Sequence, residues 1–385
     1  MAGTGRGRRG FRLRTAALRV TIGPVLGALA LAAAAAACGA APHPGQVGLT
    51  AASAQDATIK EAGSSLLYPL MHTWAGAYQQ QTPGVTVATA STSSGKGIAA
   101  ASAGTVDVGA SDAYLSSGDL VKTPDLLNIP LAIAAQTVIY NLPGMSAADH
   151  VRLNGAVLAG IYEGTITRWD DPSITTINPH VNLPDLKIVP VVRSDMSGDT
   201  FLFTSYLSTG SLSDPAPEWN RKIGYGTTVD WPSVPGELRE AGSLNVLHAC
   251  ESTPGCVAYN GISYLAQALD GNLGEAELAN YVGHYTLPTA KAIQDSVASF
   301  VSLTPPNETI SLIDGPSPTG YPIVNYEYAV VSTHQPAAKA SALKAFLRWV
   351  ITTGNKASYL AAVGFQPLPG PLVTLGEQQI GEIGS

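Results

Sequence analysis

The chain has 385 residues, of which 45% are hydrophobic and only 13% are charged, with 40 glycines and 27 prolines. This length exceeds that of one compact domain of ordinary size, so two lobes are expected. The 21 basic and 28 acidic residues give a formal net charge of −7. That balance excludes nucleic-acid binding through a basic face.

The first 37 residues are predicted to be a secretory signal. They carry six arginines and no acidic residue, and an uncharged run from residue 20 to 37 ends at Cys38. A cysteine directly after small residues indicates lipoprotein processing with acylation of Cys38, although Ala35 stands where the usual motif has Leu. An uncleaved membrane anchor is the alternative, because the run is just long enough to span a bilayer. Residues 38–57 are expected to be a flexible tether.

Removal of this signal leaves 15 basic against 28 acidic residues, a net charge of −13. Such a chain cannot attract an anion through its overall field, so an anion site must use local donors. Cys250 and Cys256, separated by five residues, predict a short disulfide loop in an oxidising compartment. The seven histidines are scattered, so we expect neither a metal nor a cofactor.

From residue 58 onward, strand-like runs alternate with helical ones. In chain order these runs are 85–89, 97–104, 106–110, 137–140, 155–162, 187–192, 200–207, 326–332 and 337–352. This alternation predicts an α/β fold with mostly parallel strands. In the last run, Leu343, Phe346, Leu347 and Val350 share one side, which indicates a helix with an apolar face.

Three segments place Ser and Gly directly before a helical pattern: 63–65, 93–97 and 197–200. A helix start leaves N–H groups unpaired and carries partial positive charge, so it attracts anions. Taken alone, each segment is most simply an N-cap. Three of them, with an arginine and an aspartate close by in sequence, favour an anion site. Segment 93–97 is not a P-loop, because Lys96 is followed by Gly97 rather than by Ser or Thr.

Longer motifs in the same regions resemble a known family. Residues 104–112 (GTVDVGASD) closely resemble the TVDFGASD signature of the periplasmic phosphate-binding proteins of ABC transporters. Residues 161–172 are similar to that family's IYLGKIKKWDD motif, and residues 193–207 to its RRADGSGTSFVFTSYL motif. The closing stretch 321–369 also matches, so the resemblance covers about residues 58 to 369.

The resemblance implies an α/β, two-lobed periplasmic-binding-protein fold (type II), with two crossing strands and the ligand in the cleft. The crossings are expected near residues 129–132 and 320–322. Lobe one would then comprise residues 58–132 and 322–385, and lobe two residues 133–321.

The resemblance also implies a set of phosphate-binding residues. They are Ser65, Leu66, Ser94, Asp112, Arg193, Ser197, Gly198 and Asp199. Asp195 would orient the Arg193 guanidinium. Asp112 would accept a hydrogen bond from a protonated oxygen of HPO4²⁻ or H2PO4⁻ and so reject sulfate, which has no proton with which to donate one. Locally, Asp112 also fits a helix N-cap. Asp199 stands where many members have Thr, and it is either a second proton acceptor or only a helix cap.

The resulting hypothesis is a monomeric, lipid-anchored protein outside the cell membrane that binds inorganic phosphate for an ABC permease, without being an enzyme. A secreted phosphatase or hydrolase using Ser94 or Ser197 is the first alternative, although no G-x-S-x-G motif or metal-ligand cluster supports it. A protein for another oxyanion is the second, with arsenate the hardest to separate from phosphate. A surface antigen or adhesion protein that keeps the fold is the third.

Overall fold

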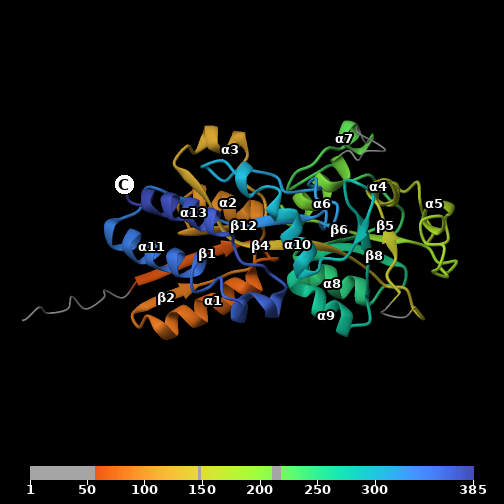
Figure 1. Cartoon of the computed structure of the whole chain (residues 1–385), viewed down its shortest axis with the longest axis horizontal. Coiled ribbons are helices and arrows are strands. Elements are labelled where there is room, and N and C mark those ends of the chain that lie inside the picture. The colour runs from red at the N-terminus through yellow and green to blue at the C-terminus, as the bar shows by residue number, and fades with distance from the viewer. Residues whose placement is uncertain (1–56, 146–148, 210–217) are drawn as a thin grey trace, which may run out of the picture. The chain divides into compact units, whose positions relative to one another are not determined.

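A computed structural model describes residues 57–145, 149–209 and 218–385 (Figure 1). The predicted signal, Cys38 and nearly all of the predicted tether lie outside these residues. Within the described ranges, no helix combines the length and the apolar character that a membrane crossing requires.

The strands of the described residues are β1 (Ala57–Gly63), β2 (Val85–Ala88), β3 (Val108–Ser111), β4 (Leu126–Tyr140), β5 (Arg152–Leu153), β6 (Val189–Arg193), β7 (Leu238–Glu240), β8 (Cys256–Gly261), β9 (Gly274–Glu275), β10 (Glu277–Ala279), β11 (Tyr285–Thr286) and β12 (Val324–Ser332). The α-helices are α1 (Tyr68–Gln81), α2 (Ser94–Ser102), α3 (Ser117–Lys122), α4 (Gly155–Glu163), α5 (Pro172–Thr175), α6 (Gly198–Ser208), α7 (Glu218–Lys222), α8 (Ser243–Glu251), α9 (Leu265–Asp270), α10 (Ala290–Ala298), α11 (Ala337–Ile351), α12 (Ala357–Leu360) and α13 (Gly370–Glu382). Short 3₁₀ turns are η1 (Ile262–Tyr264), η2 (Val301–Leu303) and η3 (Ala361–Val363). The predicted runs agree with these bounds to within three residues, except that run 137–140 is only the end of β4.

The main sheet has the order β2-β1-β3-β12-β4-β8-β6-β7, with β9 also paired to β4. Strand β1 runs parallel to β2 and β3, and β6 runs parallel to β7 and β8. The strands between these groups are antiparallel, because β12 pairs with β3 and β4 in that direction and β4 pairs likewise with β8. The prediction of mostly parallel strands was therefore wrong for the middle of the sheet.

Strand β4 changes its partner along its length. Its first part, Leu126 to Ala135, pairs with β12, and its last part, Gln136 to Tyr140, pairs with β8. All fifteen of its residues are buried, as expected for a strand covered on both faces. One strand thus belongs to both halves of the sheet (Figure 1), which is how a two-lobed fold can be connected.

The predicted disulfide is confirmed. Cys250 in the last turn of α8 and Cys256 at the start of β8 are bonded, with their Cα atoms 5.3 Å apart. Between them, Gly255 has a φ of +82°, and a Cβ there would lie 2.1 Å from the Lys187 carbonyl oxygen. Only glycine fits this tight connection.

Candidate anion-binding site

The first helix start of the site follows β1. The Tyr68 N–H donates to the Ser64 carbonyl at 3.2 Å, and the Leu67 N–H donates to Ser64 Oγ at 2.9 Å. Ser64 therefore caps the turn that leads into α1, and the N–H groups of Ser65 and Leu66 have no intrahelical acceptor. Ser64 Oγ itself donates to Asp112 Oδ1.

The second helix start is that of α2. Ser94 Oγ donates to Asp112 Oδ2 and accepts from the Asp112 N–H, both at 3.2 Å. The residue before it, Ser93, occupies the N-cap position without a capping side-chain bond. Within the residues that the structure describes, the buried Ser93 Oγ has no hydrogen-bond partner. Ser93 was not among the phosphate-binding residues predicted from the sequence. Its hydroxyl is nevertheless the one at this helix start that is available to a ligand.

The third helix start is that of α6, and it packs against the second. Ser197 caps α6 by accepting from the Thr200 N–H at 3.3 Å, which leaves the first N–H groups of the helix free of intrahelical acceptors. A Cβ at Gly198 would lie 2.3 Å from Asp112 Oδ2 and 2.4 Å from Ser94 Oγ. The Gly95 N–H donates to the Met196 carbonyl at 2.9 Å. The predicted residues 94, 112 and 198 are therefore in one place.

Arg193, at the end of β6, is 4% exposed. Its Nε and Nη2 donate to the two carboxylate oxygens of Asp195, at 2.7 and 2.6 Å. Its Nη1 donates to Asp199 Oδ2 at 2.5 Å. Burial lowers the pKa of Arg193, but the bonds and charges of the two aspartates outweigh burial and raise the pKa overall. The arginine is fully charged and held on both sides.

Asp199 lies in the first turn of α6, but its carboxylate is turned toward side chains of other elements. Oδ2 accepts from Ser243 Oγ at 2.8 Å as well as from Arg193, and Oδ1 accepts from Gln136 Nε2 at 3.2 Å. Burial raises the pKa of Asp199, and Arg193 opposes that effect. The carboxylate of Asp199 therefore contacts side chains around Arg193 and does not cap the N–H groups of α6.

Asp112 directly follows β3 and is 2% exposed. Burial, and then the charge of Asp199, raise its pKa to about 6, against the lowering effects of Glu327, Ser64 and Arg193. The next helix, α3, is capped by Ser116 through a capping box. Asp112 is therefore not a helix cap, and its carboxylate is a buried acceptor beside two serine hydroxyls.

Ser243 joins the two halves of the site, although the sequence did not single it out. Its Oγ lies 2.7 Å from Ser65 Oγ and 3.3 Å from Arg193 Nη1, and its N–H donates to Ser65 Oγ at 3.2 Å. The sequence did contain a signal for this residue, since Gly242 occupies the N-cap position of α8 and Ser243 is its first residue, as in the three predicted segments of Ser and Gly at a helix start.

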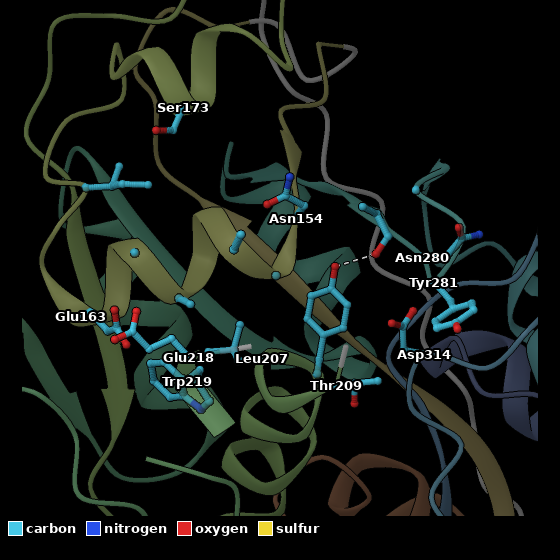
Figure 2. Close-up of a pocket in the computed structure, with 18 of the residues that line it drawn as sticks. Asn154, Glu163, Ser173, Leu207, Thr209, Glu218, Trp219, Asn280, Tyr281 and Asp314 are labelled. Atoms are coloured by element: carbon cyan, nitrogen blue, oxygen red, sulfur yellow. Dashed lines mark hydrogen bonds between the residues drawn. The ribbon is translucent and has the colours of Figure 1, made fainter. Parts of the chain in front are cut away.

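A cavity of about 840 Å³ lies elsewhere, along α4, α6 and α7 (Figure 2). Among the described residues that line it there is no predicted anion-binding residue and no Lys, Arg or His. Its acidic lining residues include Glu163, Glu218 and Asp314. An anion would be repelled there, so the cluster around Arg193 is the candidate site. Among the described residues, no group of three or more His, Cys, Asp or Glu could hold a metal ion.

A sheet joined through β4, with helix starts from both of its halves meeting at a buried cluster of Asp112, Arg193 and Ser243, is the architecture of an α/β binding protein. The family model described as "PBP superfamily domain" matches residues 49–353. The chain belongs to this superfamily.

Named relatives narrow the assignment to the phosphate-binding proteins. The chain is 34% identical to the phosphate-binding protein PstS of Methanocaldococcus jannaschii, over 83% of this chain and 84% of the relative. It is 32% identical to the protein of the same name from Pasteurella multocida, over 84% and 90%. These matches place the chain in their family.

Solved structures share the fold. A high-affinity periplasmic phosphate-binding protein (PfluDING) with bound phosphate superposes with a TM-score of 0.61 at 21% identity, covering 82% of this chain and 92% of the other. An ABC-type phosphate transport receptor from Vibrio cholerae superposes with a TM-score of 0.50 at 17% identity, covering 81% of this chain and all of the other.

Proposed function

We propose that this chain binds inorganic phosphate outside the cytoplasm and delivers it to the permease of an ABC transporter. The observation that carries the proposal is the cluster of helix-start N–H groups and serine hydroxyls around one buried arginine, with the buried Asp112 carboxylate as acceptor. Such donors bind an oxyanion without help from the net charge. The names of the relatives and of the solved structures support phosphate as the ligand and import as the role.

In this proposal, Ser65 and Leu66 donate from the first helix start and Ser94 from the second, together with Ser93. Ser197, Gly198 and Asp199 contribute from the third. Arg193 makes the charge-assisted contact, and Asp195 holds its guanidinium in a bidentate pair.

Asp112 would provide the selectivity of the site. Phosphate near neutral pH always carries a proton and can donate a hydrogen bond to a buried carboxylate, whereas sulfate would place lone pairs against lone pairs. An unpaired buried acceptor costs about 1–3 kcal/mol, and more when it is charged. A binding site that depends on such a donor rejects ligands that lack it.

Binding would also bring two lobes together. We infer lobe one at residues 58–132 and 322–385 and lobe two at residues 133–321, so that Asp112 and Gly198 belong to different lobes. Phosphate held between them would favour the closed form by population shift. The permease would then recognise the closed form.

The place of action is inferred from the N-terminus and from the relatives. We propose that the mature chain begins at an acylated Cys38 and works as a monomer tethered to the outer face of the cell membrane. The periplasmic description of one structural neighbour supports the extracytoplasmic location.

Isothermal titration with phosphate and then sulfate at pH 7, after removal of endogenous ligand, tests the proposal. Phosphate should bind with micromolar or tighter affinity, about −8 kcal/mol or better, and sulfate should not bind. Asp112→Asn and Arg193→Ala should each abolish phosphate binding. The exposed Asp270 provides a matched control, and Asp270→Asn should bind normally. Folded protein that shows no phosphate binding would refute the proposal. Turnover of phosphate esters, measured with and without a chelator, would then test the hydrolase alternative.

A further inference from the structure

A second buried carboxyl group lies beside Asp112. Glu327 is in β12 and is 0% exposed. The antiparallel register pairs Tyr328 with Ser111 of β3. One residue after Ser111 therefore lies opposite one residue before Tyr328, which brings Asp112 alongside Glu327. The register with β4 shifts between Glu327 and Tyr328, and irregularities of this kind redirect side chains beside functional sites.

The contacts of Glu327 indicate that one of the two carboxyl groups holds a proton. Its Oε1 accepts from Asn325 Nδ2 at 2.8 Å. Its Oε2 is buried and has no hydrogen-bond donor among the described residues, and the carboxyl groups of Glu327 and Asp112 are close enough to act on each other as hydrogen-bond partners. Two carboxyl groups can share such a bond only when one of them carries a proton.

The proton is assigned to Glu327, because Asp112 already accepts hydrogen bonds from Ser64 Oγ and Ser94 Oγ, which favour its ionised form. Burial, and then the charge of Asp112, raise the pKa of Glu327 well above its ordinary value. The pKa of Asp112 is raised only to about 6, and the bond from Glu327 is among the causes that lower it. The other charged groups that act on the pair are Asp199 from α6 on both carboxyls and Arg193 from β6 on Asp112.

We propose that Glu327 is a positioning residue for the anion site, which stays protonated and donates a hydrogen bond to Asp112, so that Asp112 remains an ionised and oriented acceptor for a proton of the ligand. The proposal rests on the proposed function. In this proposal, Glu327 contributes to the selectivity of the site for protonated oxyanions over fully ionised ones.

Two variants separate this role from simple packing. Glu327→Gln keeps the shape, the neutrality and a donor, so it should bind phosphate within about threefold of the wild-type protein. Glu327→Leu removes the donor. Loss of a charge-assisted bond to Asp112 should weaken phosphate binding at pH 7 roughly tenfold, which corresponds to about 1.4 kcal/mol.

The pH profile provides a readout that packing alone would not change. Without the donor, the pKa of Asp112 rises, so the loss of binding at low pH should begin about one pH unit higher in Glu327→Leu than in the wild-type protein or in Glu327→Gln. Glu308 offers a matched control, because it is also 0% exposed with a pKa raised to about 9 but contacts Gln379 instead of Asp112. Glu308→Gln should leave the phosphate affinity and its pH profile unchanged.

An infrared measurement tests the proton without any ligand. The difference spectrum between wild-type protein and Glu327→Gln at pH 7 should contain the carbonyl band of a protonated carboxylic acid. Carboxylate bands in its place would overturn the proposal, whether or not the protein binds phosphate. Equal loss of binding in Glu327→Gln and Glu327→Leu, or an unshifted pH profile in a folded Glu327→Leu, would overturn it as well.

Discussion

Replacement of Gly198 by alanine should block the closed site while leaving the fold intact. Gly198 is the first residue of α6, where alanine is well tolerated by the helix itself. The added Cβ would lie 2.3 Å from Asp112 Oδ2, 2.4 Å from Ser94 Oγ and 2.6 Å from Asp112 Cβ. Ordinary contacts between such atoms begin at about 3.4 Å, so the two segments must separate by about 1 Å.

This overlap sets the expected size of the effect. Overpacking of this kind costs about 1–3 kcal/mol, which corresponds to roughly 5- to 150-fold weaker phosphate binding if the closed arrangement is the one that binds. The cost should appear in the phosphate titration and in a smaller ligand-induced compaction measured by X-ray scattering, while the free protein should unfold normally.

Gly370 is a matched control for this experiment. It is the first residue of α13, and a Cβ there meets nothing within 4 Å. Gly370→Ala should therefore bind phosphate like the wild-type protein. Wild-type affinity in Gly198→Ala would refute the reasoning, because it would mean that the contact between α6 and Asp112 is not part of the phosphate-bound state.

Three further predictions concern Ser93 in the anion site and the stability of the fold. Ser93→Ala should weaken phosphate binding by about 1 kcal/mol in titrations and leave the melting temperature unchanged, because its buried hydroxyl has no partner among the described residues. Reduction of the Cys250–Cys256 disulfide should lower the free energy of unfolding by about 2 kcal/mol in urea denaturation; an unchanged midpoint would contradict this. Burial raises the pKa of Glu61 to about 8 and that of Glu308 to about 9, both above the value in the unfolded chain. The free energy of unfolding that each of them contributes is therefore complete below about pH 4.5 and is lost as the pH rises toward 9. Each group lowers the free energy of unfolding by up to about 1.4 kcal/mol for every pH unit in that range. Glu61→Gln and Glu308→Gln should each flatten that decline in urea denaturation.

The local parts of the site could be predicted from the sequence. Ser and Gly before a helical pattern locate a helix start without knowledge of the fold, because the unpaired N–H groups are a property of the helix itself. In the structure, the three predicted helix starts lie around Asp112 and Arg193. Run 137–140 underestimated β4 because residues 129–135 form an apolar stretch without alternation, which periodicity cannot assign.

The contacts of the site between residues far apart in the sequence could not be predicted. Ser243 and Glu327 reach Arg193 and Asp112 only through the sheet order, and alternation of strands and helices does not determine which strands pair or in which direction. Glu327 in particular is the one acidic residue of β12, and its neighbour is set by the register between β12 and β3. The same lack of information explains the wrong expectation of a mostly parallel sheet.

The charges of the site determine which form of phosphate it can hold. The charge of Arg193 is already balanced by Asp195, whose side chain is 6% exposed, and it is exceeded by the charges of Asp199 and Asp112, which are buried. A protonated Glu327 adds no charge, so the site would carry two negative charges before the anion arrives. Attraction must then come from helix-start dipoles and hydroxyls, and the ligand must bring protons for the carboxylates. We therefore expect H2PO4⁻ to bind better than HPO4²⁻, so that the phosphate affinity falls as the pH rises above neutral, where the second form predominates. A phosphate affinity that rises from pH 7 to 8.5 would contradict this account of the charges.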